Sequence, residues 1–310
     1  MMIEAMMKAI RYHAFGEVDV LQVEQVPVPQ PQSGEVLIRV HAAGVLPVDW
    51  KIRRGLFPMP VQFPNIPGTA FAGVVAAVGE GVSEWQVGQS VFGRSTKGTY
   101  AEYTTAPADA IALKPASISY DEASSLSGGA TTAWRAIVSE GNVQPTDRIL
   151  IHGAGGGVGL FAVQFAKWIG AEVIATAGPA NVAFVQSLGA DKVINYTTER
   201  FEDVAKDVDL VLDTVGGEIT ARSCAVLKPG GRLASIAGQP PIEKAKQLGI
   251  QLIRPGVATQ DDLNAIVKLI DEGHVQITIE KSYALEEVRL AHEQSQTGHG
   301  RGRVVLRIEK

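Results

Sequence analysis

A glycine-rich turn near the middle of the chain has the residue types and the spacing to bind a phosphate. Residues 148–152 form a short apolar run suited to a buried strand, and residues 158–169 have the composition of a helix. Between them, Ala154, Gly156 and Gly159 fall at the fixed positions of a G-x-G-x-x-G pattern, with alanine first. Glycine at the second position leaves room for a pyrophosphate, and glycine at the third lets the helix pack against the strand. The turn therefore predicts a dinucleotide site, with backbone N–H groups and the helix N-terminus facing the phosphates.

The context of this turn separates it from an ordinary glycine-rich turn of an α/β protein, which is the alternative. An apolar strand precedes it, a helix follows, and a second apolar run comes at 172–176. A motif match in that order is much more specific than the glycines alone. The expected contacts of the turn with the dinucleotide are Gly156, Gly157, Val158 and Gly159.

The residues after the second apolar run bear on the choice of cofactor. NAD-specific sites place an Asp or Glu there, about 20 residues past the glycines, to bind the ribose 2′-hydroxyl. Residues 176–181 read T-A-G-P-A-N, without an acid to repel a 2′-phosphate and without an Arg or Lys to attract it. We expect NADP(H), held by hydrogen bonds from Thr176, Ala180, Asn181 and Tyr196. Capping of the next helix is an open alternative for Asn181, as is surface packing for Tyr196.

Composition narrows the class of protein. The chain has 310 residues, of which 45% are hydrophobic and 20% charged, in the range of a globular protein long enough for two domains. Its net charge of −5, without a basic run, argues against a nucleic-acid partner. No apolar run approaches the roughly 20 residues of a membrane span, and the N-terminus lacks a signal-peptide pattern. A single cysteine, Cys224, excludes an internal disulfide. We expect a cytoplasmic protein.

The order of apolar segments predicts two kinds of architecture. The first 120 or so residues have the patterns of strands, at 35–42, 72–79 and 98–105, followed by helical character over 119–140. From residue 147 strands alternate with helices, which favours a parallel, doubly wound sheet. The expected strands are 148–152, 172–176, 192–195, 208–212 and 231–236, and the expected helices are 158–169, 180–188 and 219–227. Gly189 and Gly230 are expected just past helix ends. A helix over 261–272 and a strand over 302–308 complete the chain.

Four segments together resemble the medium-chain dehydrogenase/reductase superfamily. Residues 44–55 (G-V-L-P-V-D-W-K-I-R-R-G) are similar to its G-V-N-P-V-D-W-K segment, and residues 66–73 (I-P-G-T-A-F-A-G) to its I-P-G-T-D-x-A-G segment. Residues 154–159 fit its A-x-G-G-V-G loop, and residues 298–306 resemble its terminal G-H-x-x-G-K-V-V-L. The resemblance implies an α/β protein in which a GroES-like, β-rich catalytic domain (1–124 and 256–310) is split by a Rossmann domain (125–255).

Within the superfamily, residues 176–191 are similar to a stretch of the chloroplast-type alkenal/one oxidoreductases. This resemblance implies a zinc-independent enzyme that uses NADPH to reduce quinones or the C=C bond of α,β-unsaturated carbonyl compounds. Two positions depart from the family pattern: Leu46 stands where asparagine is common, and Ala70 where aspartate is common. They leave open which of these substrate classes applies.

Zinc catalysis is the main competing chemistry, since zinc alcohol dehydrogenases share this architecture. A catalytic zinc needs three protein ligands, but residues 46–48 and 68–70 read L-P-V and G-T-A, and the six histidines are scattered without ligand spacing. We expect no metal. Lys51 is then the expected cation beside the acceptor's carbonyl oxygen, with a surface pairing to Asp49 as the alternative. Tyr100 and Tyr103 are expected to pack between strands, so that protonation falls to water.

The resemblance also implies contacts beyond the glycine turn. It places Thr131 beside the nicotinamide, Ile236, Ala237 and Gly238 at the end of a Rossmann strand, and His299 and Arg303 on a C-terminal segment that returns to the site. A solvated loop histidine is the alternative for His299. A homodimer is expected through a strand edge near 231–253. A non-catalytic, crystallin-like NADPH-binding protein is the alternative function, which Leu46 and Ala70 keep open.

Overall fold

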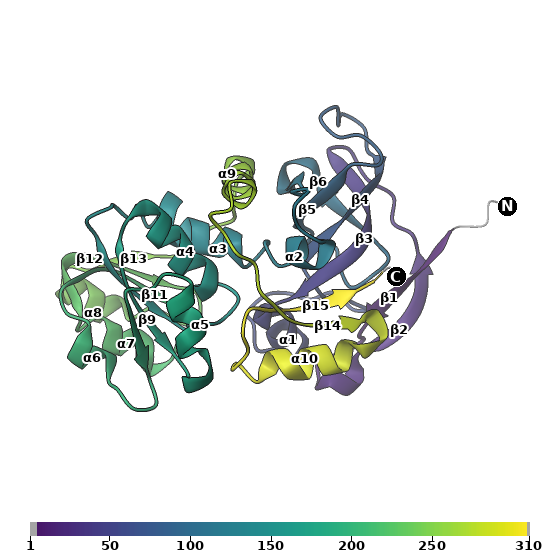
Figure 1. Cartoon of the computed structure of the whole chain (residues 1–310). Helices are drawn as coiled ribbons and strands as arrows, with labels where there is room; N and C mark the ends of the chain where they lie inside the picture. The colour runs from purple at the N-terminus through teal and green to yellow at the C-terminus, as the bar shows by residue number, and fades with distance from the viewer. Residues whose placement is uncertain (1–4, 309–310) are drawn as a thin grey trace. The chain divides into compact units, whose positions relative to one another are not determined.

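The computed structural model describes residues 5–308, and the chain divides into two compact units. The β unit comprises Met1–Gly128, Thr259–Asp271 and Ile277–Lys310, and the α/β unit comprises Gly129–Ala258 and Glu272–Gln276. The sequence places the domain borders after residues 124 and 255, whereas the units divide after residues 128 and 258. Figure 1 labels the elements of both units. The expected fold class, a β-rich unit plus an α/β unit with a parallel sheet, is confirmed by the strand pairing described below.

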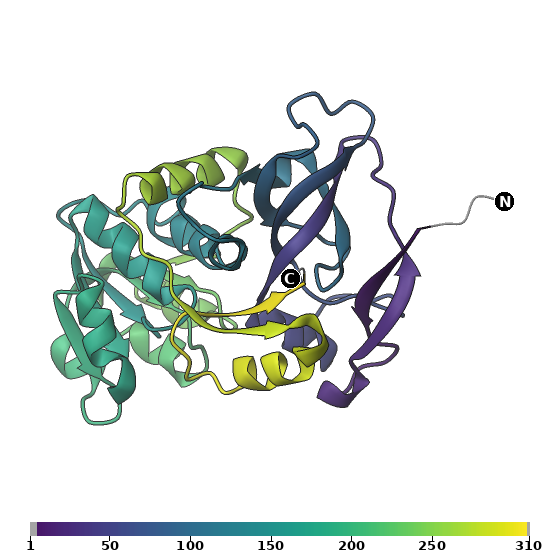
Figure 2. The same ribbon diagram turned by 45° about the vertical axis from the view of Figure 1, so that its right-hand side comes forward.

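The β unit is built on a seven-stranded sheet in the order β14-β15-β3-β4-β5-β7, with β6 also paired to β3, and a separate two-stranded sheet of β1 and β2. The strands are β1 Met6–Arg11, β2 Gln22–Pro27, β3 Glu35–Val45, β4 Ala70–Val78, β5 Ser90–Arg94, β6 Tyr103–Pro107, β7 Ile111–Leu113, β14 Ile279–Ala284 and β15 Arg303–Arg307. Its helices are α1 Pro47–Arg53, α2 Tyr120–Ser124, α9 Gln260–Asp271 and α10 Val288–Gln296, with 3-10 turns at Val18–Val20, Ala108–Ala110 and Leu285–Glu287. Figures 1 and 2 both show α10 alongside β14 and β15.

Strand β3 connects the two hydrophobic cores of the β unit and leads into α1. Its first half buries Val36 and Ile38 in one hydrophobic cluster, and its second half buries Ala43 and Val45 in another. Irregularities in its pairing with β4 let this long strand change neighbours, so that β6 pairs with its start and β15 with its end. The chain then passes directly from β3 into α1, which fixes α1 to the edge of the second core.

The α/β unit contains a six-stranded parallel sheet in the order β10-β9-β8-β11-β12-β13. Its strands are β8 Arg148–His152, β9 Glu172–Ala177, β10 Lys192–Asn195, β11 Val208–Asp213, β12 Leu227–Ser235 and β13 Gln251–Ile253. The helices are α3 Ala130–Trp134, α4 Gly159–Ile169, α5 Val182–Ser187, α6 Phe201–Val204, α7 Glu218–Ser223 and α8 Ile242–Gln247, with a π-helical turn at Arg135–Ser139 and a 3-10 turn at Pro179–Asn181. Strands run outward from β8 in both directions, so the carboxyl end of β8 lies at a topological switch point, where ligands bind in such sheets.

Of the two glycines expected just past helix ends, one lies there and the other does not. Gly189 follows α5 with a φ of +102°, which confirms it as a helix terminator. Gly230 was wrongly placed at a helix end: α7 stops at Ser223, and Gly230 lies within β12, near an irregularity in the pairing with β11. Glycine with positive φ serves a strand irregularity as well as a helix end, so the residue type alone does not distinguish the two.

Two expected elements are shorter than the sequence suggests. The helical stretch over 119–140 is divided into α2 and α3, between which Gly128 adopts a φ of +70°, and α3 continues directly into the π-helical turn. The strand expected over 98–105 begins only at Tyr103, and Gly98 takes a φ of +90° in the preceding loop. A left-handed glycine interrupts the regular backbone of a helix or strand.

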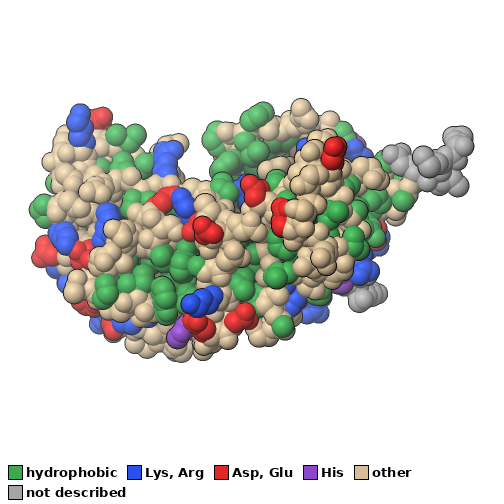
Figure 3. Space-filling model, turned by 90° about the horizontal axis from the view of Figure 1, so that it is seen from above, with side chains coloured by type: hydrophobic (Ala, Val, Ile, Leu, Met, Phe, Trp, Pro, Cys, Tyr) green, Lys and Arg blue, Asp and Glu red, His purple; other side chains and the backbone are tan. Residues whose placement is uncertain are grey.

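Two further features are the distribution of charge on one face and the length and polarity of the helices. On the face in Figure 3, acidic and basic side chains are scattered among hydrophobic ones. Across residues 5–308, every helix is too short or too polar to cross a membrane.

Candidate functional site

The glycine turn follows β8 in the α/β unit and has the geometry that its sequence predicts. A Cβ added at Gly159 would lie 2.4 Å from the Gly153 carbonyl oxygen and 2.6 Å from the Ala154 Cα, so only glycine lets α4 start this close to the turn. At Gly156 the Gly153 carbonyl oxygen is the one atom of the described residues within 4 Å of an added Cβ, at 3.3 Å, so a side chain here would also be tight against the turn. Gly156, Gly157 and Val158 are half-buried. The N-terminus of α4 therefore lies beside accessible backbone, as an anion site requires.

A buried hydrogen-bond chain, called the His152 relay below, holds the start of this turn. His152 Nδ1 lies 3.1 Å from Thr176 Oγ1, and His152 Nε2 lies 3.1 Å from Ser223 Oγ. The Ser223 hydroxyl donates to the Ile219 carbonyl at 2.7 Å, so its oxygen accepts from His152 Nε2. Thr176 Oγ1 accepts from the Gly153 N–H at 3.3 Å and donates to His152 Nδ1. Burial lowers the pKa of His152 to about 4, so the imidazole in this chain is neutral.

In this arrangement Thr176 serves the turn itself, and its expected contact with a 2′-phosphate stays a prediction. Its side chain is buried, and the hydroxyl is engaged by His152 and by the Gly153 N–H. A hydroxyl has one proton and two lone pairs, and the turn already uses the proton. The sequence signal for the relay was weak, because its members are separated by 24 and 71 positions.

Asn181 and Tyr196 lie on the accessible side of the same strand ends. A Cβ added at Gly155 would come 3.0 Å from Asn181 Nδ2, so the amide lies directly against the turn. The capping alternative for Asn181 is wrong, since it occupies the N-cap position of α5 without a side-chain capping bond. Tyr196 is 52% exposed, and its hydroxyl would lie 3.0 Å from a Cβ at Gly178. Ala180 is exposed beside them.

The other side of the switch point is shaped by Asp213 at the end of β11. Its buried carboxylate accepts from the N–H groups of Val215 and Gly216, each at 2.9 Å, and from the Thr220 hydroxyl. A Cβ at Gly216 would lie 1.9 Å from the Ala237 carbonyl oxygen, so this turn packs against the end of β12. Ile236 and Gly238 are exposed there, with Ala237 half-buried. Asp213 thus orders the loop next to three expected contacts, a role that its position before a glycine pair does not reveal.

In the β unit, α1 carries Lys51 and a buried aspartate. Lys51 is half-buried, with Nζ 5.5 Å from the centroid of the Trp50 ring. The alternative pairing of Lys51 with Asp49 is wrong: Asp49 is 2% exposed, and its Oδ2 accepts from the Leu46 N–H and the Tyr100 hydroxyl, both at 2.8 Å. Tyr100 is fully buried, as expected, and its proton is committed to Asp49.

The two departures from the family pattern point inward. Leu46 is buried, with its Cδ2 only 2.1 Å from where a Cβ at Gly128 would be, so Leu46 fills the space that this glycine leaves. Ala70 is buried beside Gly44. Both side chains contribute apolar packing within the β unit.

The expected contacts from the C-terminal segment lie in different environments. His299 is exposed. Arg303 is 5% exposed, donates to the Gly128 carbonyl at 3.2 Å and lies near Asp49, and burial lowers its pKa to about 10. The structure thus places Arg303 in the interior of the β unit, and its expected contact with the cofactor stays a prediction. Thr131 lies on α3 in the α/β unit with a nearly buried side chain.

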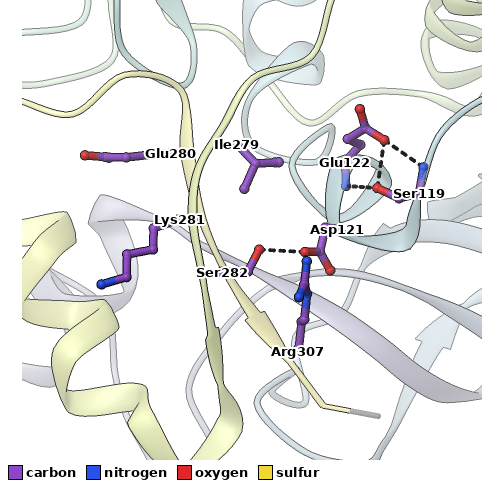
Figure 4. A pocket seen from close by; sticks show the side chains of 8 residues that line it. All are labelled: Ser119, Asp121, Glu122, Ile279, Glu280, Lys281, Ser282 and Arg307. Carbon is purple, nitrogen blue, oxygen red and sulfur yellow. Dashed lines mark hydrogen bonds and ion pairs between the residues drawn. The ribbon is translucent and has the colours of Figure 1, made fainter. Parts of the chain in front are cut away.

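A shallow hollow elsewhere in the β unit is not a good candidate site. Figure 4 shows Asp121 between two donors, the Ser282 hydroxyl at 2.6 Å and Arg307 Nε at 2.7 Å. Glu122 is likewise engaged by the Ser119 N–H and hydroxyl. These carboxylates are therefore satisfied within the chain. The residues lining the hollow are Ser119, Asp121, Glu122, Ile279, Glu280, Lys281, Ser282 and Arg307. In the part of the chain from residue 5 to 308, no cluster of three or more His, Cys, Asp or Glu side chains has an arrangement that would hold a metal ion.

Comparisons with known proteins agree with this geometry. Residues 32–116 match the family model described as an alcohol dehydrogenase GroES-like domain, and residues 188–306 match the one described as a zinc-binding dehydrogenase. The chain is 33% identical to the quinone oxidoreductase of Mus musculus over 98% of each chain.

Solved structures extend the likeness to three dimensions. The quinone oxidoreductase from Coxiella burnetii is similar with a TM-score of 0.91 and 34% identity, over 98% of this chain and 100% of that one. The Escherichia coli quinone oxidoreductase complexed with NADPH is similar with a TM-score of 0.88 and 28% identity, over 97% of this chain and 100% of that one.

Proposed function

Since this chain belongs to the medium-chain dehydrogenase/reductase superfamily as a quinone oxidoreductase-like member, we propose that it transfers a hydride from NADPH to a small electrophile. The acceptor is a quinone or the C=C bond of an α,β-unsaturated carbonyl compound, and no zinc takes part. The observation that carries this proposal is the glycine turn at the switch point of the parallel sheet, where Gly159 lets α4 start beside half-buried backbone.

The residues at the switch point fit a dinucleotide phosphate. The backbone of Gly156, Gly157, Val158 and Gly159 and the N-terminus of α4 would hold the pyrophosphate. Asn181, Tyr196 and the Ala180 backbone would hold the 2′-phosphate, since none of them carries a negative charge. Thr131 and residues 236–238 would lie toward the nicotinamide, with His299 as an exposed further contact. The Escherichia coli relative with NADPH bound supports this choice of cofactor.

The acceptor half of the reaction is assigned to the β unit. Bound NADPH supplies the hydride, and the chain must stabilise negative charge on the acceptor's carbonyl oxygen. Lys51 is the proposed cation. Asp49 accepts hydrogen bonds from the Leu46 N–H and the Tyr100 hydroxyl and does not pair with the Lys51 ammonium group, which lies near the Trp50 ring. Tyr100 is buried with its proton on Asp49, so water is the proposed proton donor.

The test is an assay of NADPH oxidation by the purified chain with a simple benzoquinone and a short-chain enone in parallel. Turnover of either acceptor, faster with NADPH than with NADH, is expected, and the ratio of the two rates assigns the acceptor class. Absence of turnover with every quinone and enone tried would overturn the reductase proposal.

A binding protein without catalysis is the second candidate, and the inward-packed Leu46 and Ala70 are the observations that favour it. It predicts NADPH binding, seen by nicotinamide fluorescence, without turnover. For either candidate we propose a homodimer formed through β13, which is one of the two edge strands of the parallel sheet. Light scattering that shows only monomer at every concentration would contradict the dimer.

A further inference from the structure

Helix α1 has one buried face and one accessible face, and its charged residues alternate between them. Asp49 and Arg53 are four positions apart and therefore lie on the same side of the helix, with exposed fractions of 2% and 0%. Lys51 is two positions from each, which turns its side chain to the opposite side. Whatever holds Asp49 and Arg53 in place therefore determines the direction in which Lys51 points.

The anchor at Asp49 uses a single carboxylate oxygen. Oδ2 accepts from the Leu46 N–H, which fixes the first turn of α1 to its own N-cap, and from the Tyr100 hydroxyl, which ties that turn to the loop before β6. The Tyr100 ring is itself held edge-on against His292 of α10, with ring centroids 5.7 Å apart. Arg303 of β15 is near enough that its positive charge favours the ionised carboxylate.

The anchor at Arg53 closes the same face one turn later. Its Nη2 donates to Gln296 Oε1 at the end of α10 at 2.7 Å and lies 3.8 Å from Glu17 Oε2. Beyond the helix, the Leu56 N–H donates to the Lys51 carbonyl at 2.8 Å. The backbone of α1 is thus attached at its start, middle and end.

Burying the charged Asp49 costs more free energy than apolar side chains at the same place would. A buried ion pair is often no more stabilising than well-packed apolar residues of the same volume. Asp49 is fully desolvated, and burial raises its pKa to about 6 despite the bonds it accepts and the charge of Arg303. Asp49 adds directional hydrogen bonds, which a pair of apolar side chains would lack.

We propose that Asp49 and Tyr100 are positioning residues for Lys51: their hydrogen bond fixes the first turn of α1 and so aims the ammonium group at the acceptor's carbonyl oxygen. The proposal rests on the function proposed above for Lys51. Neither residue touches the acceptor, and both act through the backbone of α1.

The test is a double-mutant cycle between Tyr100→Phe and Lys51→Met in the full chain, read as kcat and KM for NADPH-dependent quinone reduction. Tyr100→Phe removes the hydroxyl and keeps the ring, so we expect kcat to fall about tenfold with KM for NADPH unchanged. In the Lys51→Met background, Tyr100→Phe should cause no further loss, because the group that it positions is gone. Losses that multiply in the double variant would overturn the proposal.

Tyr283→Phe is the matched control, since Tyr283 is a buried tyrosine of the same hydrophobic cluster. It should leave kcat unchanged. Asp49→Asn keeps an oxygen at the position that accepts both bonds, and should retain more activity than Asp49→Ala. Equal losses in these two variants at equal folded fraction would contradict a positioning role.

Amide hydrogen exchange separates failure of this proposal from failure of the proposed function. If the wild-type chain reduces no acceptor, the function fails, and the positioning claim is then read from α1 alone. Exchange of the α1 amides should quicken in Tyr100→Phe and stay unchanged in Tyr283→Phe. Unchanged exchange in both variants would overturn the claim.

Discussion

The two buried polar groups beside the site residues are built on opposite principles. In the His152 relay each donor meets an acceptor, from the Gly153 N–H through Thr176, His152 and Ser223 to the Ile219 carbonyl. The second group, called the Asp49 cluster, comprises Asp49, Arg53, Tyr100, His292 and Arg303. Several of its polar atoms find no hydrogen-bond partner among residues 5–308. These atoms are Asp49 Oδ1, Arg53 Nε and Nη1, and both ring nitrogens of His292.

The two groups differ both in how many of their hydrogen bonds are formed and in whether they carry formal charge. The relay is neutral, so burial costs little once its hydrogen bonds form. The cluster buries formal charges, and its opposite charges compensate one another only in part. Removing a hydrogen-bonding group from the relay should therefore cost less stability than removing a charge from the cluster. The predictions below test this contrast in order of expected size.

Removing the central carboxylate should have the largest effect. Asp49→Ala leaves Arg303 without its compensating charge and the Leu46 N–H and Tyr100 hydroxyl without an acceptor. The free energy of unfolding should fall by about 3–5 kcal/mol, measured by urea denaturation. A loss below that of the relay variant described next would refute the contrast.

Breaking the relay should cost less. His152→Phe keeps a buried ring, which already packs edge-on near Phe201, but removes both hydrogen bonds and leaves the Thr176 hydroxyl without an acceptor. We expect about 1–3 kcal/mol of lost stability. Because the relay holds Gly153, NADPH affinity should also fall, as followed by fluorescence titration. Asp49→Ala serves as the comparison, since its NADPH affinity at equal folded fraction should be unchanged.

The two groups should also respond to acid in opposite directions. The pKa of His152 is lowered from 6.5 to about 4, so the unfolded chain binds more protons between these values, and stability falls as the pH drops. The pKa of Asp49 is raised from 3.8 to about 6, so the folded chain binds more protons there, and stability rises as the pH drops.

Each titration contributes a slope of at most about 1.4 kcal/mol per pH unit. Compared with the wild type, His152→Phe should weaken the acid loss of stability between pH 6.5 and 4. Asp49→Asn should strengthen it below pH 6, because the opposing contribution is gone. Thermal melts across this range provide the measurement, and parallel curves for the three proteins would show that neither group titrates as described.

The smallest effect is expected from Thr176→Val, which preserves shape and removes one hydroxyl of the relay. The Gly153 N–H and His152 Nδ1 each lose a partner. Stability should fall by about 1 kcal/mol, and the affinity for NADPH by a few-fold. A loss of NADPH affinity far above that of His152→Phe would instead indicate that Thr176 contacts the cofactor directly.

Local patterns in the sequence predicted the glycine turn better than the Asp49 cluster. The glycine turn could be located because strand, turn and helix are contiguous, and the geometry at Gly156 and Gly159 follows from their spacing. The Asp49 cluster joins residues from α1, the loop before β6 and β15, and Tyr100 is 51 positions from Asp49. Periodicity carries no signal for such distant partners.

The same limit applies to Thr176 and Arg303, whose burial the sequence did not predict. Both residue types suit a phosphate, and both lie in segments that lead to a site, but burial assigns them to other partners. Which side of a strand end faces inward depends on register, and register is set by pairing across the sheet. The sequence could therefore place these residues in the right neighbourhood without deciding which way they point.

The contact between Leu46 and Gly128 also constrains how this chain can change over generations. Any Cβ at position 128 would overlap the Leu46 side chain, and the left-handed backbone there already disfavours other residues. A smaller residue at position 46 would remove this overlap but leave the backbone strain at position 128. Glycine is therefore required at position 128 first by the conformation of its backbone, and Leu46 adds a second constraint that only its own side chain imposes.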